Sequence, residues 1–168
     1  YGSALRKILK FNEKTTDYIE KRKSEMNLPV DYIAVHIRRG DKIVSREMKE
    51  LGLSLYIDAV KGKKHISRNV FIATDDSSVK DELKSILVAE GFNVYCNTAV
   101  TQTGFDESLF NTKDKKSRYI DTLNMLLDMD ILIHSSFFIG TYTSNVSRIV
   151  PLYVGFGKSL SLDDEWKL

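Results

Sequence analysis

The sequence of 168 residues has little of several features that would define its class. It contains one cysteine, which excludes an intrachain disulfide bond and a structural zinc site built from several thiolates. Two prolines and nine glycines exclude a collagen-like or linker-rich chain. With 25 Lys and Arg against 23 Asp and Glu, the formal charge is only +2, which gives no reason to expect a protein dedicated to nucleic acids or membrane surfaces.

Long hydrophobic runs are also missing. The longest candidate, residues 125–140, is interrupted by Asp128, Asp130 and His134, whereas a bilayer-spanning helix needs about 20 apolar residues. The chain begins without Met and without a signal-peptide pattern, so we interpret it as an excised domain of a longer protein. Because 42% hydrophobic and 29% charged residues suffice for one core, we expect a single domain over residues 1–168.

What is present is an alternation of two kinds of segment. Short apolar runs predict buried strands, and these are residues 31–37, which is rich in β-branched residues, 69–74, 92–96 and 136–140. Helical spacing of apolar residues predicts helices, and these are residues 4–26, 54–62, 77–90 and 117–133. The alternation predicts an α/β fold with a parallel sheet and helices on both of its faces.

The composition of the remaining segments also predicts local structure. Either Ser77 or Ser78 is expected to cap the helix that follows the second strand. Residues 97–115 are polar and aperiodic, which is typical of a long binding loop. A short helix is expected before Pro151, and residues 152–155 are interpreted as a last strand.

Three of the predicted strands end in polar clusters. These are residues 38–42, 74–78 and 141–145. In an open parallel sheet, ligands bind outside the carboxyl ends of the strands. A hydrophobic core has no need of polar side chains there, so the clusters predict a ligand site at this edge.

The first cluster carries the strongest chemical signal. Guanidinium groups bind phosphates bidentately, so Arg38 and Arg39, with Lys42, favour a pyrophosphate ligand. Asp41 can hold one arginine by a salt bridge. A solvated pair of arginines is the alternative interpretation. His36, inside the strand, is either a core histidine or part of the site.

The other two clusters are ambiguous alone. The acidic residues Asp75 and Asp76 are equally typical of a helix cap at the positive end of the helix dipole. The third cluster opens a helix, where hydroxyl and N–H groups can receive phosphate oxygens, as any capped helix start can.

Asp128 stands out because its neighbours are apolar. A partly buried carboxylate needs specific hydrogen-bond donors, and either a guanine edge or a lysine or arginine can supply them. Asp128 and Asp130 are two residues apart on a helix, so they do not face each other and cannot chelate one metal ion. The sequence also lacks the P-loop and G-x-G-x-x-G patterns.

Four segments, in order, resemble the GDP-fucose-binding half of the α1,6-fucosyltransferase family, which includes animal core enzymes and bacterial nodulation enzymes. Val-His-Ile-Arg-Arg-Gly-Asp-Lys resembles that family's His-Val-Arg-Arg-Thr-Asp-Lys motif, and Phe-Ile-Ala-Thr-Asp-Asp resembles its Tyr-Leu-Ala-Thr-Asp-Asp. The third segment resembles its Cys-Thr-Phe-Ser-Ser-Gln-Val-Cys-Arg region, and the fourth its Ser-Leu-Asp-Asp. The segments are residues 35–42, 70–77, 127–148 and 161–164.

The resemblance implies a Rossmann-like domain, the donor-binding half of a GT-B-type glycosyltransferase, with defined residue roles. Arg38 would hold the β-phosphate and the departing charge, with Arg39, Asp41 and Lys42 supporting the same region. His36 would line the nucleotide site. The remaining substrate-binding residues are Asp128 at the guanine, Asp75 and Asp76 beside the sugar, and Thr143, Ser144, Asn145 and Val146 at the diphosphate.

The resemblance also implies a reaction: transfer of L-fucose from GDP-fucose, with inversion and without a metal or other cofactor, to a glycan acceptor in α1,6 linkage to N-acetylglucosamine. The ungapped position of the family's general base is Arg46, so Glu47 beside it is the expected catalytic base, with Glu50 nearby. A non-catalytic GDP-sugar-binding or regulatory module is an alternative. Because Arg-Arg-x-Asp also occurs in α1,2- and protein O-fucosyltransferases, those activities stay open.

The expected partners follow from the same resemblance. They are GDP-fucose, a glycan acceptor and an upstream acceptor-binding domain outside this chain, with no nucleic acid and no membrane contact within this chain. We expect the protein to lie in the Golgi lumen, where its full-length form would be a type II membrane enzyme. The cytoplasm is the alternative location. Asn145 begins an N-glycosylation sequon, Asn-Val-Ser, inside the expected diphosphate turn.

Overall fold

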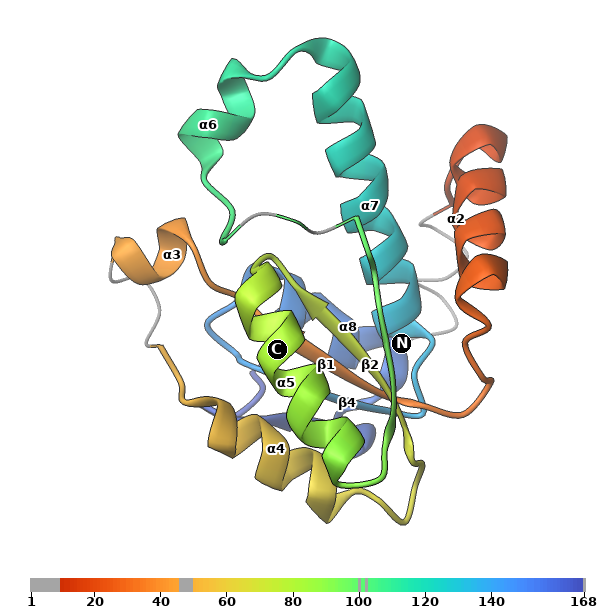
Figure 1. Cartoon of the computed structure of the whole chain (residues 1–168), viewed down its shortest axis with the longest axis vertical. Helices are drawn as coiled ribbons and strands as arrows, with labels where there is room; N and C mark the ends of the chain where they lie inside the picture. The colour runs from red at the N-terminus through yellow and green to blue at the C-terminus, as the bar shows by residue number, and fades with distance from the viewer. Residues whose placement is uncertain (1–9, 46–49, 100, 102, 168) are drawn as a thin grey trace.

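The computed structural model describes residues 10–45, 50–99, 101 and 103–167 (Figure 1). Its strands form one five-stranded sheet in the order β3-β2-β1-β4-β5, and every neighbouring pair is parallel. The strands are β1 (Ile33–Ile37), β2 (Asn69–Thr74), β3 (Asn93–Cys96), β4 (Phe137–Gly140) and β5 (Ser159–Ser161). The predicted α/β fold with a parallel sheet is therefore confirmed.

Helices cover both faces of this sheet. The helices are α2 (Glu13–Met26), α3 (Asp41–Val44), α4 (Leu53–Gly62), α5 (Ser77–Ala89), α6 (Glu107–Thr112), α7 (Lys115–Ile133) and α8 (Asn145–Val154), with a 3-10 turn η1 (Phe156–Lys158). Helices α4 and α5 pack on one face, and α2, α7 and α8 pack on the other. Helix α6 and the first turns of α7 extend beyond the sheet (Figure 1).

The central strand β1 is buried on both faces, which explains its continuous apolar sequence. Its alternate residues point to opposite layers: Ile33, Val35 and Ile37 join the core under α4 and α5, whereas Ala34 joins the core under α7 and α8. None of the helices in the described part of the chain is long and apolar enough to cross a membrane.

Side-chain caps set where several helices begin. Asn12 caps α2 by accepting the Thr15 N–H, which places the helix start at Glu13; the predicted residues 4–9 lie outside the described residues. The cap of α5 is Asp76, so the expectation of Ser77 or Ser78 is wrong. A carboxylate accepts two N–H groups there, those of Ser78 and Val79, and is therefore the better cap.

Two further expectations are wrong. Residues 97–115 are not one loop, because Asp106 caps the short helix α6 inside them. Residues 152–155 belong to the end of α8 and its cap, and the last strand is β5. Helix α8 continues through Pro151 because Val150 and Tyr153 are buried, so tertiary packing outweighs the low helix propensity of proline.

Candidate functional site

The polar clusters that follow β2, β1 and β4 lie at one edge of the sheet. These strands are neighbours in the sheet and run parallel, with Ile37 paired to Thr74 and Val35 paired to Ile139. The segments that leave their carboxyl ends therefore emerge side by side. The structure brings the three predicted clusters together, as the ligand-site hypothesis requires.

Arg38 is held in place from three sides. Its Nη2 donates to Asp41 Oδ1 at 2.8 Å, and its Nη1 lies 3.1 Å from Asp75 Oδ2. The guanidinium carbon lies 4.9 Å from the centroid of the Phe105 ring. The side chain keeps 20% of its surface exposed, so the guanidinium is oriented but still accessible. The expectation that Asp41 binds an arginine is confirmed.

The loop that supplies Phe105 is joined tightly to the arginine turn. Asp75 accepts the Phe105 N–H at 2.9 Å through its carboxylate and the Gly104 N–H at 3.0 Å through its carbonyl, while Phe105 O accepts the Asp41 N–H at 3.0 Å. Gly40 and Gly104 both have positive φ, at 71° and 91°. A Cβ on Gly40 would lie 2.3 Å from Phe105 O, so only glycine fits this crossing.

Arg39 points away from Arg38 and into the protein. Its backbone N–H donates to Asp75 Oδ1 at 2.7 Å, and its Nη2 donates to the carbonyl of Leu51 at 2.8 Å. Only 7% of Arg39 is exposed, and Glu50 lies 3.8 Å from its Nη1. Arg39 therefore supports the turn from inside, and a part in binding the β-phosphate stays a prediction.

His36 connects β1 to α8. Its Nδ1 lies 2.7 Å from the hydroxyl of Ser147, and both side chains are buried. Burial, reinforced by the nearby positive charge of Arg38, lowers the pKa of His36 to about 3, so the imidazole is neutral. His36 is buried like a core histidine, and its contact with Ser147 fixes the first turn of α8; that it lines a nucleotide site stays a prediction.

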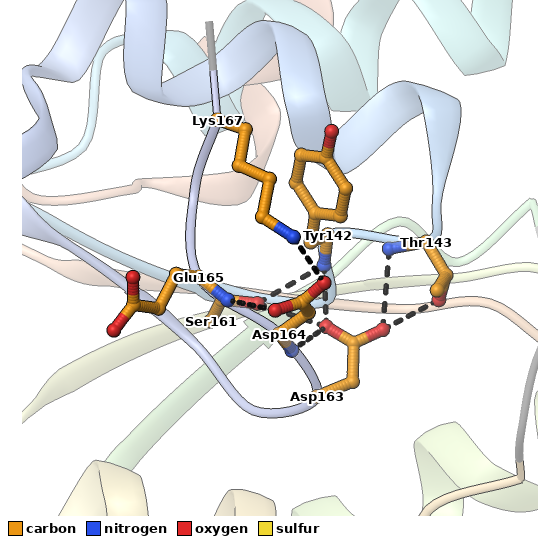
Figure 2. Close-up of polar contacts among 7 residues, drawn as sticks. All are labelled: Tyr142, Thr143, Ser161, Asp163, Asp164, Glu165 and Lys167. Atoms are coloured by element: carbon orange, nitrogen blue, oxygen red, sulfur yellow. Dashed lines mark hydrogen bonds and ion pairs between the residues drawn. The ribbon is translucent and has the colours of Figure 1, made fainter.

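The turn before α8 is built around a carboxylate from the end of β5. Asp163 accepts hydrogen bonds from the N–H of Tyr142, the N–H and hydroxyl of Thr143, and the hydroxyl of Ser161 (Figure 2). Ser144 then caps α8. The first N–H groups of the helix, those of Asn145 and Val146, have no intrahelical partner at such a position.

Asp75 and Asp76 have different partners. Asp75 joins the arginine turn to the Phe105 loop, as described above. Asp76 caps α5; its slight burial works to raise its pKa, but hydrogen bonds from Ser78 and Val79 outweigh burial and leave the pKa below its usual range. The helix-cap interpretation therefore describes Asp76 and not Asp75. A place beside the sugar stays a prediction for both.

Asp128 lies inside α7 on its sheet side. Burial raises the pKa of its carboxyl to about 7, against a smaller opposite effect from a hydrogen bond with Asn97, the residue that follows β3. Its Oδ1 is buried without a hydrogen-bond partner. Within the residues that the structure describes, Asp128 has no ion pair, which removes the salt-bridge interpretation there and leaves guanine binding as a prediction.

Two predicted residues cannot be placed. Glu47 and the side chain of Lys42 lie outside the described residues. Residues 10–45, 50–99, 101 and 103–167 contain no group of three or more His, Cys, Asp or Glu side chains that could hold a metal ion.

Sequence reasoning missed Phe105, Gly104 and Asp163. The Ser-Leu-Asp-Asp segment was a signal for Asp163, but nothing in it indicated which turn the carboxylate would bind. An open cavity of about 740 Å³ lies beside β5 and is lined by Phe156 and residues 159–166, so Asp163 stands between this cavity and the turn before α8.

Comparison with known proteins gives a consistent result. Residues 1–152 match the family model described as alpha-(1,6)-fucosyltransferase N- and catalytic domains. An alpha-(1,6)-fucosyltransferase of Caenorhabditis elegans is 23% identical over 161 residues, which are 88% of this chain and 26% of that protein. The chain thus spans about a quarter of the curated relative that it matches.

Solved structures of two fucosyltransferases share the fold. The NodZ alpha-1,6-fucosyltransferase of Bradyrhizobium, soaked with GDP-fucose, has a TM-score of 0.56 at 22% identity. The match covers 86% of this chain and 43% of the NodZ chain. POFUT1 in complex with GDP-fucose has a TM-score of 0.58 at 15% identity. The match covers 95% of this chain and 48% of the POFUT1 chain. The fold is therefore Rossmann-like, as in these GT-B-like fucosyltransferases.

Proposed function

The chain belongs to the alpha-(1,6)-fucosyltransferase family, and from this premise we propose that it binds GDP-fucose and serves the transfer of L-fucose, with inversion, to a glycan acceptor. The proposed linkage is α1,6 to N-acetylglucosamine. Because the chain spans about a quarter of its curated relative, we assign the acceptor site to the rest of a longer enzyme. The chain alone is proposed to bind the sugar nucleotide.

The observation that carries this proposal is the arrangement of Arg38. Two carboxylates and an aromatic ring fix its guanidinium at the edge of the sheet, beside the strand end from which α8 starts. A fixed guanidinium and helix N–H groups are the two kinds of group that bind a diphosphate most directly. Neither group is needed at this edge to complete the core.

The proposed reaction balances as a single displacement. The acceptor hydroxyl oxygen forms a bond to C1 of fucose while the bond between C1 and the β-phosphate oxygen breaks, and GDP leaves with that electron pair. Attack from the opposite side inverts C1. The acceptor proton passes to a carboxylate base, for which Glu47 is proposed on the resemblance alone.

Arg38 is proposed to neutralise the leaving diphosphate, a role that a metal ion plays in other transferases. The proposal therefore includes metal independence. Adding EDTA should leave the affinity of the chain for GDP unchanged, whereas loss of binding that Mg²⁺ or Mn²⁺ restores would refute this part.

Replacing Arg38 tests the proposal as a whole. In the full-length enzyme, Arg38→Ala should lower turnover on the order of a hundredfold, because a charge-assisted contact to the leaving group is strongest in the transition state. Arg38→Lys should restore little activity since the fork geometry is lost. The matched control is Arg68→Ala, an exposed arginine at the opposite edge of the sheet. Near-normal turnover of Arg38→Ala would contradict the assignment.

Glu47→Gln separates an enzyme from a module that only binds a GDP-sugar. If the chain is part of an enzyme with Glu47 as base, this variant of the full-length protein loses transfer but keeps GDP affinity. Calorimetry of the 168-residue chain with GDP, GDP-fucose, ADP and UDP completes the test, since a general phosphate binder would not distinguish them. A Golgi location stays part of the proposal, supported by the resemblance to animal core enzymes.

A further inference from the structure

The carboxylate of Asp163 accepts hydrogen bonds from the turn that precedes α8 (Figure 2). Its Oδ1 accepts the Tyr142 N–H at 2.6 Å and the Ser161 hydroxyl at 2.9 Å. Its Oδ2 accepts the Thr143 N–H at 3.2 Å and the Thr143 hydroxyl at 2.5 Å. One carboxylate thus fixes two consecutive peptide groups of the turn although it lies some twenty residues later in the chain.

The carboxylate is itself fixed by the sheet. Ser161 pairs with Gly140 in the β4–β5 ladder, and the Leu162 N–H donates to the carbonyl of Gly140 at 3.0 Å. After Asp163, the ring of Trp166 lies 6.0 Å from that of Phe138, a core residue of β4. The segment is therefore anchored before and after Asp163, as part of the fold and not as a flap over the site.

Asp163 and His36 hold the same short stretch from its two ends. Asp163 binds residues 142 and 143, just before the helix, and His36 binds Ser147, in the first turn of the helix. Between these two points lie Asn145 and Val146, whose N–H groups open α8. The direction of those N–H groups is thus set by two side chains from different segments, one in β1 and one just after β5.

We infer that Asp163 is a positioning residue for the diphosphate of the sugar nucleotide: it holds the turn so that the N–H groups of Asn145 and Val146 face the ligand. This inference rests on the proposed function. It also changes the expected role of Thr143, whose hydroxyl and N–H donate to Asp163 and so support the turn instead of binding the diphosphate directly.

The charge of Asp163 suits this role. Partial burial works to raise its pKa, but hydrogen bonds from Thr143, Ser161 and the turn N–H groups outweigh burial, so the pKa lies below its usual range and the group is ionised at neutral pH. An ionised carboxylate only accepts hydrogen bonds, which matches five donors, the four above and the backbone N–H of Asp164. An asparagine would turn an NH₂ group toward at least two of these donors.

The experiment compares Asp163→Asn with Asp164→Asn in the 168-residue chain. Asp164 is the neighbouring exposed carboxylate, bonded to Lys167 and not to the turn, so its variant matches the charge change (Figure 2). Calorimetry gives the affinity for GDP, guanosine and inorganic pyrophosphate, and hydrogen exchange gives the protection of the Tyr142 and Thr143 amides without ligand.

We expect Asp163→Asn to lower the affinity for GDP and pyrophosphate about tenfold or more, on the scale of hydrogen bonds to charged groups. The affinity for guanosine should be retained. The Tyr142 and Thr143 amides should exchange faster. Asp164→Asn should leave the three affinities and the exchange rates of both amides within twofold of the wild type. If Asp163 had a purely structural role, the affinities for GDP and guanosine would fall by the same factor, and that result would overturn the inference.

Failure of this inference is distinguishable from failure of the proposed function. If the wild-type chain binds GDP and Asp163→Asn binds it equally well, only the inference falls; if the wild-type chain binds no GDP, both fall. Should Asp163→Asn not fold, Thr143→Val removes one of the same bonds and Thr143→Ser retains it. GDP affinity should then fall in the valine variant alone, and equal affinities in the two would overturn the inference.

Discussion

Adjacent residues of the same type have different surroundings at this site. Arg38 and Arg39 are indistinguishable in the sequence, yet the first guanidinium is accessible and the second is buried against the carbonyl of Leu51. The sequence predicts that arginines follow the strand, because residue type and position are local properties. Which of them faces a ligand depends on Asp75 and Phe105, which arrive from distant parts of the chain.

Asp128 should make stability depend on pH. The pKa of its carboxyl is raised from 3.8 to about 7, so the folded protein binds a proton that the unfolded chain has released between these values. Stability from this group is therefore complete below about pH 4 and falls as the pH rises toward 7, by up to about 1.4 kcal/mol per pH unit. Urea unfolding at about pH 5 and pH 8.5 should show that Asp128→Asn gains stability relative to wild type at the higher pH.

The control for this experiment is Asp58→Asn, because Asp58 is exposed on α4. Its stability relative to wild type should not change between the two pH values. A constant difference for Asp128→Asn as well would mean that the Asp128 carboxyl is ionised throughout and that Asn97 or water compensates its charge.

The same substitution tests the guanine prediction. An amide in place of the carboxylate presents a donor to one of the guanine N–H groups, so Asp128→Asn should bind GDP much less tightly and lose discrimination against ADP. Calorimetric titrations with GDP and ADP measure both effects. An unchanged GDP/ADP ratio would restrict Asp128 to a structural role beside Asn97.

At the scale of the element, the Phe105 loop depends on two glycines. A Cβ on Gly104 would lie 2.6 Å from the Cα of Gly40, at a φ of 91° that other residues rarely adopt. Gly104→Ala should therefore push the loop away and release Phe105 from Arg38. GDP affinity should fall about tenfold or more if Arg38 positioning matters, in keeping with loss of a charge-assisted contact.

Gly62→Ala is the matched control, because a Cβ there meets nothing within 4 Å and the residue lies at the end of α4. It should leave GDP affinity unchanged. If Gly104→Ala also binds GDP normally while its stability falls, the loop serves folding and does not orient Arg38.

Strands and helices could be predicted from the sequence where the residues that determine them lie within the same segment. The predicted bounds of β2, residues 69–74, coincide with the structure, because a buried β-branched run between polar residues has no competing interpretation. Residues 152–155 also include Tyr and Val, which favour strands, but Tyr153 is buried by continuing α8 on the sheet. Ile120 fits the helical register of α7 yet is 44% exposed, because the first turns of that helix extend beyond the sheet.

For the whole molecule, the sequon beginning at Asn145 tests compartment and site together. Asn145 is exposed, but Ser147 is buried and bonded to His36 in the first turn of α8, so the folded sequon is not extended for modification. In protein expressed through a secretory pathway, we expect Asn145 to remain unmodified in the GDP-binding fraction. Mass spectrometry of that fraction measures the occupancy.

The printed sequence has no second sequon, so a glycoprotein secreted by the same cells would serve as the control for glycosylation capacity. If a fraction fully glycosylated at Asn145 still bound GDP or transferred fucose, the turn before α8 would not line the nucleotide site. The positions proposed for Asn145 and Val146 would then be excluded.

The strand order β3-β2-β1-β4-β5 has a consequence for how the chain folds. The first strand in the sequence is the middle one in the sheet, and its register partner for Ile33 on one side is Phe137, near the other end of the chain. During synthesis, one side of β1 stays unpaired until β4 has been synthesised and has left the ribosome. Such high contact order makes folding slow. Until β4 arrives, one edge of the apolar strand β1 is unpaired, and an unpaired apolar edge is a site where a nascent chain can aggregate.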